Sequence, residues 1–162
     1  MKSNLLGKIK NVKVFLFDLE GVLLKDKSLC GLCFDQLSSV YKEYKEDGLM
    51  FGIITARKED QFIDKLKTLE GCEVIFSSLD KVSAADRFLR EHGFGFRDLF
   101  YMGDDILDIP LLERCGFSAA PHSARREVKR IVDFIVQNDD CRGLLKEIIT
   151  YFKQSKEEAS FA

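Results

Sequence analysis

The chain has 162 residues, of which 46% are hydrophobic and 32% charged, and its formal net charge is -2, a composition typical of one globular domain. The slight negative charge gives no electrostatic case for a nucleic-acid partner, and no apolar run approaches the roughly 20 residues that span a bilayer. Residues 1–10 lack the apolar core and the cleavage site of a signal peptide, so we expect a cytoplasmic protein with no membrane partner.

Strand-like and helix-like segments alternate along the chain. The run at 12–17 is apolar and rich in residues typical of a strand buried on both faces of a parallel sheet. The predicted strands are 12–17, 49–54, 73–76, 99–102, 117–120 and 132–136. The predicted helices are 30–45, 58–69, 83–92 (with a start near Leu79), 109–115, 123–130 and 144–152.

This alternation predicts an α/β fold of three layers, in which helices cover both faces of a central, mostly parallel sheet. We expect one Rossmann-like domain over residues 1–162 with no cap domain, and a frayed tail over residues 154–162. Ligands bind such sheets outside the carboxyl ends of the strands, so the residues that follow each strand are candidates for the site. They are 18–21, 55–57, 77–78 and 103–105.

Two of these candidates, Asp18 and Asp104, are carboxylates that directly follow buried strands, where charge is costly unless it is compensated. A hard divalent cation would relieve their repulsion, and oxygen ligands favour Mg²⁺. With a phosphate oxygen held by the metal, Asp18 could attack phosphorus and form an aspartyl-phosphate. Thr55 offers a hydroxyl group, and Lys81 a positive charge, to the transferring phosphoryl group.

Single members of this set also have ordinary structural explanations. Thr55 could cap the helix that follows it, Lys81 could be a solvated helix lysine, and Asp105 could cap the next short helix. In the catalytic interpretation, Asp105 and Asp108 would hold metal-bound waters or orient Lys81. The joint occurrence of these residues at strand ends favours the catalytic interpretation.

The five cysteines are an odd number in a chain without an export signal, which favours reduced thiols. Cys30 and Cys33 form a CxxC pair, but no second ligand pair and no thioredoxin-like context accompany it. We therefore interpret both as small buried thiols near the start of a helix.

The order of the site candidates resembles the haloacid dehalogenase (HAD) superfamily. The resemblance covers roughly residues 12–146 and implies a phosphatase with Mg²⁺ as cofactor and a small-molecule phosphate ester as substrate. The stretches that carry it are 15–22 (FLFDLEGV), 53–57 (IITAR), Lys81 at the front of a helix, and 101–110 (YMGDDILDIP).

The resemblance also implies a role for each site residue. Asp18 would be the nucleophile, and Glu20 would protonate the leaving oxygen and then activate water. The metal would be bound by Asp18, Asp104 and the backbone carbonyl of Glu20, with Asp105 and Asp108 behind these ligands. The residues that would bind the phosphate or the substrate are Thr55, Ala56, Arg57 and Lys81.

Within the superfamily, the sequence is similar to small capless members, 3-deoxy-manno-octulosonate 8-phosphate phosphatase and the phosphatases attached to acylneuraminate cytidylyltransferases. This likeness implies a sugar acid phosphate as substrate and a homo-oligomer. The sequence departs from these phosphatases at two places. Glu20 stands where they carry aspartate, and its longer side chain adds about 1.5 Å of reach. Residues 23–29 are too few for the β-hairpin that builds their tetramer. Both departures favour an alternative function, a catalytically weak or inactive HAD-fold module for binding or assembly.

Overall fold

Six parallel strands form the centre of the molecule, in the order β3-β2-β1-β4-β5-β6. The computed structural model describes residues 2–26, 28, 30–77 and 80–160. The observed sheet confirms the predicted α/β class, and no separate cap domain stands apart from it in the described part of the chain. The strands are β1 (Val14–Asp18), β2 (Met50–Thr55), β3 (Cys72–Phe76), β4 (Leu99–Met102), β5 (Phe117–Pro121) and β6 (Phe134–Val136).

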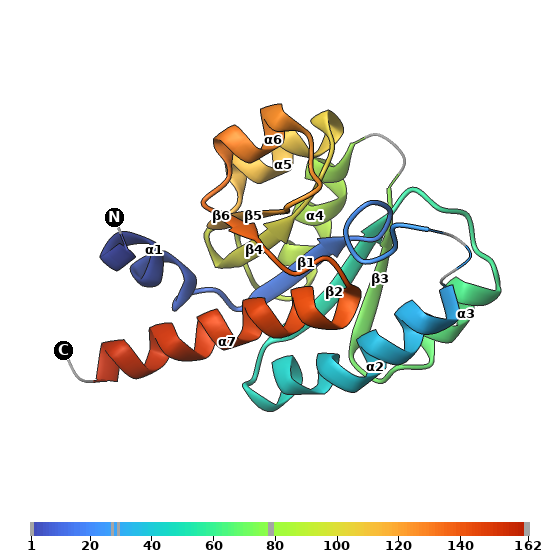
Figure 1. Ribbon diagram of the computed structural model, residues 1–162, viewed down its shortest axis with the longest axis horizontal. Coiled ribbons are helices and arrows are strands. Elements are labelled where there is room, and N and C mark those ends of the chain that lie inside the picture. Colours follow the sequence, from blue (N-terminus) through green and yellow to red (C-terminus); the bar gives the residue numbers. More distant parts are fainter. Residues whose placement is uncertain (1, 27, 29, 78–79, 161–162) are drawn as a thin grey trace.

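Helices cover both faces of this sheet, as predicted. In Figure 1 one layer of helices (α4, α5 and α6) lies above the sheet, and α2 and α7 lie below it. The helices are α1 (Lys2–Ile9), α2 (Cys30–Glu46), α3 (Gln61–Lys67), α4 (Lys81–Glu91), α5 (Ile109–Arg114), α6 (Arg126–Ile131) and α7 (Cys141–Ser160), with 3-10 turns η2 (Phe96–Asp98) and η3 (Ile106–Asp108).

Strand β1 lies inside the sheet between β2 and β4, and all five of its residues are buried. On the face covered by α2 and α7, the ring of Phe15 lies 4.8 Å from that of Phe100 and 5.2 Å from that of Tyr44, measured between centroids. The Tyr44 hydroxyl donates a hydrogen bond of 2.7 Å to the carbonyl of Leu145, which ties α2 to α7. Leu16 belongs to the separate core under α4, α5 and α6. These two cores fix β1, and therefore the position of its last residue.

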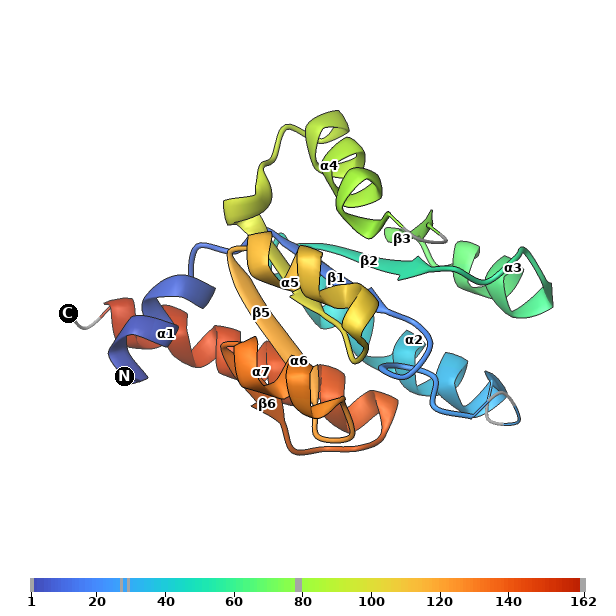
Figure 2. The same ribbon diagram turned by 90° about the horizontal axis from the view of Figure 1, so that it is seen from above.

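The last helix is longer than predicted. The expectation that residues 154–162 fray is wrong for the described part, because α7 continues to Ser160. The cause is tertiary packing: Phe152 and Ser155 are buried, and the final turns of α7 lie beside α1 in both views (Figure 1, Figure 2). Helix α1 itself was not predicted, although its Ile9 is fully buried in the core.

Several smaller differences concern element ends. Helix α3 begins at Gln61 rather than at 58, because the Asp60 side chain caps it by accepting a hydrogen bond of 2.9 Å from the backbone N–H of Ile63. Helix α6 begins at Arg126 rather than at 123. Ser78 and the predicted helix start near Leu79 lie outside the described residues, as do positions 27, 29 and 161–162.

All five cysteines are free thiols, and Cys33 is buried near the start of α2 as expected, whereas Cys30 is only partly buried. Among the described residues, no helix combines the length and the apolar character that crossing a membrane requires.

Successive strands are added first on one side of β1 and then, from β4 on, on its other side. The chain moves outward from β1 through β2 to β3, and then returns to the other side of β1 as β4. Such a reversal opens a crevice at the carboxyl ends of the two adjacent strands. In this sheet the residues at that crevice come directly after Phe17 and Met102, which are paired in register.

Candidate active site

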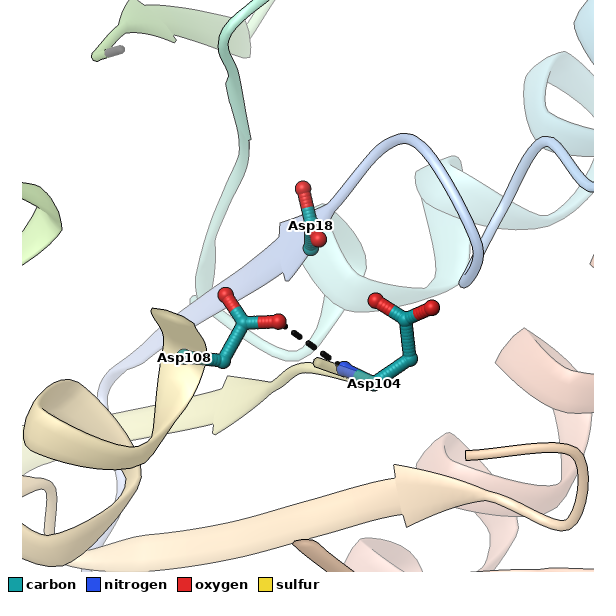
Figure 3. A group of neighbouring side chains, drawn as sticks. All are labelled: Asp18, Asp104 and Asp108. Carbon is teal, nitrogen blue, oxygen red and sulfur yellow. Dashed lines mark hydrogen bonds between the residues drawn. The ribbon is translucent and has the colours of Figure 1, made fainter. Parts of the chain in front are cut away.

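Three aspartates meet at this crevice. Asp18 ends β1, Asp104 follows β4 after one glycine, and Asp108 ends the turn η3. One carboxylate oxygen from each lies within 4.8 Å of the others, and Figure 3 shows the three side chains converging from these separate elements. The predicted approach of Asp18 and Asp104 is therefore present in the fold.

Asp108 is fully enclosed and serves as an acceptor on both of its oxygens. Its Oδ1 accepts from the Lys81 ammonium at 2.6 Å and from the Tyr101 hydroxyl at 2.7 Å. Its Oδ2 accepts from the backbone N–H groups of Asp104 at 2.9 Å and Asp105 at 3.1 Å. Because a carboxylate has about four lone-pair directions, these donors occupy Asp108. Asp108 thus holds its neighbours in place and has little capacity left to bind a metal directly.

Lys81 connects two of the aspartates. It is the first residue of α4, where the Asp80 side chain caps the helix by accepting from the backbone N–H of Ser83. Its ammonium lies 3.3 Å from Asp18 and 2.6 Å from Asp108. Burial by itself would lower the pKa of Lys81, but the two carboxylates outweigh it and raise the pKa, so Lys81 stays charged.

The electrostatic environment disfavours charge on Asp18. Burial, followed by the neighbouring Asp108, raises the pKa of Asp18 to about 8, against the opposing effect of Lys81. Burial, followed by Asp108 and Asp105, also raises the pKa of Asp104. Three carboxylates thus face one ammonium, and the cluster has too little positive charge to hold all of them ionised. A divalent cation between Asp18 and Asp104 would supply it.

A glycine makes the convergence possible. Gly21 has a φ of +84°, and a Cβ at this position would lie 1.9 Å from Oδ2 of Asp104. Its backbone N–H donates to the carbonyl of Leu24 at 2.9 Å, which closes a tight turn after β1. Among the described residues of 19–26 the only strand-type pairing is an isolated bridge between Glu20 and Leu24, so this part of the segment forms a turn and contains no hairpin.

Most of the predicted site residues share one pocket of about 270 Å³. Its lining consists of Asp18, Glu20, Gly21, Ala56, Lys81, Asp104, Asp105 and Leu107. Asp105 is half-exposed and combines two contacts: it caps η3 by accepting from the N–H of Ile106, and it forms an ion pair of 3.1 Å with Arg125. The capping alternative for Asp105 is therefore present, and its role behind the metal ligands stays a prediction.

Thr55 and Arg57 do not line this pocket. Thr55 is fully buried, and its hydroxyl oxygen accepts the backbone N–H of Arg57 at 2.9 Å. The Arg57 side chain instead lines a neighbouring cavity of about 410 Å³ and lies 3.3 Å from the Glu20 carboxylate. Their predicted contact with phosphate stays a prediction, as does the metal contact of the Glu20 carbonyl.

Three residues of the site lie in stretches that the sequence analysis named, but no role was predicted for any of them. Tyr101 supports Asp108, and its signal was a hydroxyl-bearing side chain within the otherwise apolar strand β4. Gly21 leaves room for the Asp104 side chain because it has no Cβ. The glycine that follows the carboxylates after β1 was a sequence signal for such a close approach. Leu107 lines the pocket although it is an apolar residue in a polar motif, and no sequence feature indicated it.

Comparison with known families agrees with this geometry. A family model of haloacid dehalogenase-like hydrolases matches residues 68–148, which is half of the chain. The protein belongs to this family of hydrolases.

Among curated proteins, the chain is similar to 3-deoxy-D-manno-octulosonate 8-phosphate phosphatases named KdsC. The Escherichia coli K12 protein is 23% identical over 155 residues, which cover 91% of this chain and 82% of the relative. The Haemophilus influenzae protein is 24% identical over 165 residues, which cover 94% of this chain and 89% of the relative.

Solved structures show the same fold. A structure described as a HAD superfamily hydrolase of subfamily III A, from Legionella pneumophila, has a TM-score of 0.82 at 22% identity and covers 98% of this chain and 92% of its own. The 3-deoxy-D-manno-octulosonate 8-phosphate phosphatase of Moraxella catarrhalis, in complex with magnesium, phosphate and KDO, has a TM-score of 0.74 at 20% identity and covers 99% of both chains.

Proposed function

We propose that this protein is a Mg²⁺-dependent phosphomonoester hydrolase that uses Asp18 as its nucleophile. The observation that carries the proposal is the position of Asp18 at the end of β1, 3.3 Å from the Lys81 ammonium and beside Asp104. Membership of the hydrolase family supports the reaction class. The named activity of the KdsC relatives supports a sugar acid phosphate as the substrate.

The donor set suits magnesium. Asp18 and Asp104 present carboxylate oxygens, and Asp108 is already saturated by hydrogen bonds from behind. Hard cations prefer such oxygen ligands, and Mg²⁺ commonly uses one or two carboxylates together with substrate phosphate oxygens. When bound, the ion would neutralise the two carboxylates and polarise the phosphoryl group. The raised pKa values of Asp18 and Asp104 fit a site that needs such a cation.

The residues of the pocket can then divide the chemistry. Ionised Asp18 attacks phosphorus, and the ester oxygen leaves with a proton from Glu20, which forms an aspartyl-phosphate and releases the alcohol. Lys81 balances charge on the transferring group. Glu20, now a carboxylate, removes a proton from a water molecule that attacks phosphorus. Phosphate leaves, and Asp18 and protonated Glu20 are restored.

The pocket limits what the substrate can be. With a volume of about 270 Å³ and no cap domain over it in the described part of the chain, it holds a phosphoryl group and leaves the rest of the ester near Leu107 and Ala56. A small phosphorylated metabolite meets this limit, and a sugar acid phosphate is the class that the relatives support.

The proposal is tested by phosphate release from a panel of sugar phosphates and a chromogenic ester, with Mg²⁺ and with EDTA. We expect Mg²⁺-dependent release that Asp18→Asn abolishes. Asp86→Asn is the matched control, because Asp86 is a surface aspartate of α4 that pairs with Arg90. Release that persists in Asp18→Asn would contradict the proposal.

A second candidate is a metal-binding module with little or no turnover. The observation that favours it is Glu20, whose longer side chain is held by Arg57. The two candidates differ in the response to Glu20→Asp. A gain of about a hundredfold or more, the size expected when a misplaced group is corrected, would show that the native residue weakens catalysis.

A further inference from the structure

Glu20 lies at the boundary between two cavities. It lines the pocket of Asp18, Lys81 and Asp104, and its Oε1 lies 3.3 Å from Nη1 of Arg57. Arg57 belongs to the wall of the neighbouring cavity of about 410 Å³. The guanidinium therefore contacts the proposed acid and base of the reaction from outside the pocket in which the reaction takes place.

The backbone around Glu20 is fixed, so its freedom lies in the side chain. The residue pairs with Leu24 in an isolated bridge, the N–H of Gly21 donates to the carbonyl of Leu24, and the N–H of Leu19 donates to the carbonyl of Ile54 at 3.2 Å. The Glu20 side chain is 43% exposed and has one rotatable bond more than aspartate. Without a contact, such a side chain would sample several rotamers at the mouth of the pocket.

Arg57 is itself held firmly, which makes it a suitable anchor. Its Nε lies 2.5 Å from Oδ2 of Asp60, its guanidinium carbon lies 5.4 Å from the ring centroid of Phe62, and its backbone N–H donates to Thr55. Its side chain is 17% exposed. The hydrogen bond and charge of Asp60 raise the pKa of Arg57, so its positive charge is permanent.

We propose that Arg57 is a positioning residue for Glu20, and this inference rests on the proposed phosphatase function. An ion pair whose carboxylate is 43% exposed adds little to stability, so its effect is on orientation. A fixed guanidinium beside the carboxylate selects one placement of the longer side chain and so offsets the additional methylene. Glu20 and Arg57 then form a matched pair in which each residue requires the other.

The contacts of the Arg57 guanidinium place it directly on Glu20. Nε is engaged by Asp60 and Nη1 by Glu20, while Nη2 lies 4.0 Å from the sulfur of Cys30. Two of the five N–H groups of the guanidinium, one at Nε and one at Nη1, point at protein carboxylates and so hold its orientation relative to Glu20. The geometry therefore favours an action through Glu20.

The test is a double-mutant cycle of Arg57→Gln and Glu20→Asp, with kcat and KM measured on p-nitrophenyl phosphate at saturating Mg²⁺. This ester has no carboxylate that Arg57 could bind. We expect Arg57→Gln to lower kcat about tenfold or more in the wild-type background, because small misplacements of reacting groups cost this much or more. The same substitution should change kcat by less than about twofold in the Glu20→Asp background, since the shorter side chain does not depend on Arg57. KM should change by less than about twofold in both backgrounds.

Two further variants separate orientation from charge. Lys65→Gln removes a positive charge from the wall of the same cavity, but Lys65 lies over the ring of Phe34 and leaves the Glu20–Arg57 pair intact. It should leave kcat unchanged. Asp60→Asn keeps an oxygen that can cap α3 but removes the charge that holds Arg57, so it should lower kcat in the same direction as Arg57→Gln and by a smaller factor.

Four results would overturn the inference. An equal loss of kcat in both backgrounds would show that Arg57 does not act through Glu20, and a rise in kcat on Arg57→Gln would show that it restrains Glu20. A rise in KM at unchanged kcat would assign Arg57 to substrate binding. Absence of any Mg²⁺-dependent turnover in the unmodified protein would overturn the proposed function together with the inference. The wild-type measurement alone detects this case, so it is distinguished from a failure of the inference about Arg57.

Discussion

Lys81 and Asp108 form a buried ion pair, with Nζ 2.6 Å from Oδ1 and the aspartate fully enclosed. Breaking such a pair by removing one charge leaves the other uncompensated, which is expensive in a buried environment. The same lysine contacts Asp18, so the pair connects the stability of the fold to the position of the proposed nucleophile.

Asp108→Asn should therefore reduce both stability and rate. The amide group cannot accept all four hydrogen bonds that reach the carboxylate, and Lys81 loses its closest counter-charge. We expect a loss of about 3 kcal/mol in the free energy of unfolding, measured with urea, and a fall in kcat of at least about a hundredfold. Asp86→Asn should change the free energy of unfolding by less than about 0.5 kcal/mol. Equal, small effects of the two variants would contradict this role of Asp108.

The free energy of unfolding of the metal-free protein should depend on pH through Asp18. Its pKa is about 8 in the folded state and 3.8 in the reference state, so the folded chain holds a proton that the unfolded chain releases. This contribution to stability is fully present below about pH 4 and is lost as pH rises to about 8, with a slope of up to about 1.4 kcal/mol per pH unit.

Unfolding in EDTA at pH 5, 6, 7 and 8 would measure this effect against Asp18→Asn. Titrating groups that do not interact with Asp18 are common to both proteins and cancel in the difference. The wild type should lose stability relative to Asp18→Asn as the pH rises. Parallel curves would show that Asp18 is already ionised at pH 5.

Gly21→Ala should eliminate activity through a specific collision. The new Cβ would overlap Oδ2 of Asp104, and the backbone has a φ of +84°. Gly48 is the matched control: its φ is +75°, but no atom lies within 4 Å of the position of a Cβ. Both alanine variants should lose about 1 kcal/mol of stability from the backbone conformation. Only Gly21→Ala should lose turnover and Mg²⁺ binding, measured by phosphate release and calorimetry.

Mg²⁺ binding should displace a proton. Because the ion binds the ionised form of Asp18, its affinity should rise with pH up to about 8, by as much as tenfold per unit. Calorimetry in two buffers of different ionisation enthalpy should detect the release of about one proton per ion near pH 6 and almost none above pH 9. Asp104→Asn should abolish the binding heat, whereas Asp86→Asn should retain it. Binding that is independent of pH would place the ion elsewhere.

The sequence predicted those parts of the fold that depend on local pattern. The apolar run before Asp18 indicated β1, and the glycine-aspartate run after β4 indicated the second carboxylate of the site. The late turns of α7 were not predictable, because contacts with α1 and the burial of Phe152 stabilise them, and neither is visible in local composition. Fraying was the expectation from the polar sequence alone.

Within the site, too, the residue types could be predicted from the sequence, whereas the side-chain contacts could not. The order of the motifs nominated Lys81 and Asp108, with orientation of Lys81 as one possible role of Asp108, and the structure shows that the two form a pair. The contact between Glu20 and Arg57 joins turns after two different strands, and it depends on how Asp60 holds the arginine. Side-chain direction of this kind has no signature in one sequence.

The central claim is that Asp18 carries the phosphoryl group during turnover. It is tested most directly by rapid acid quenching of the enzyme with excess substrate and Mg²⁺, followed by mass spectrometry of the intact chain and its peptides. The account predicts an adduct with the mass of one phosphoryl group on the peptide containing Asp18, absent from Asp18→Asn and labile to hydroxylamine. Steady turnover with no adduct at any quench time, or an adduct on another residue, would contradict it.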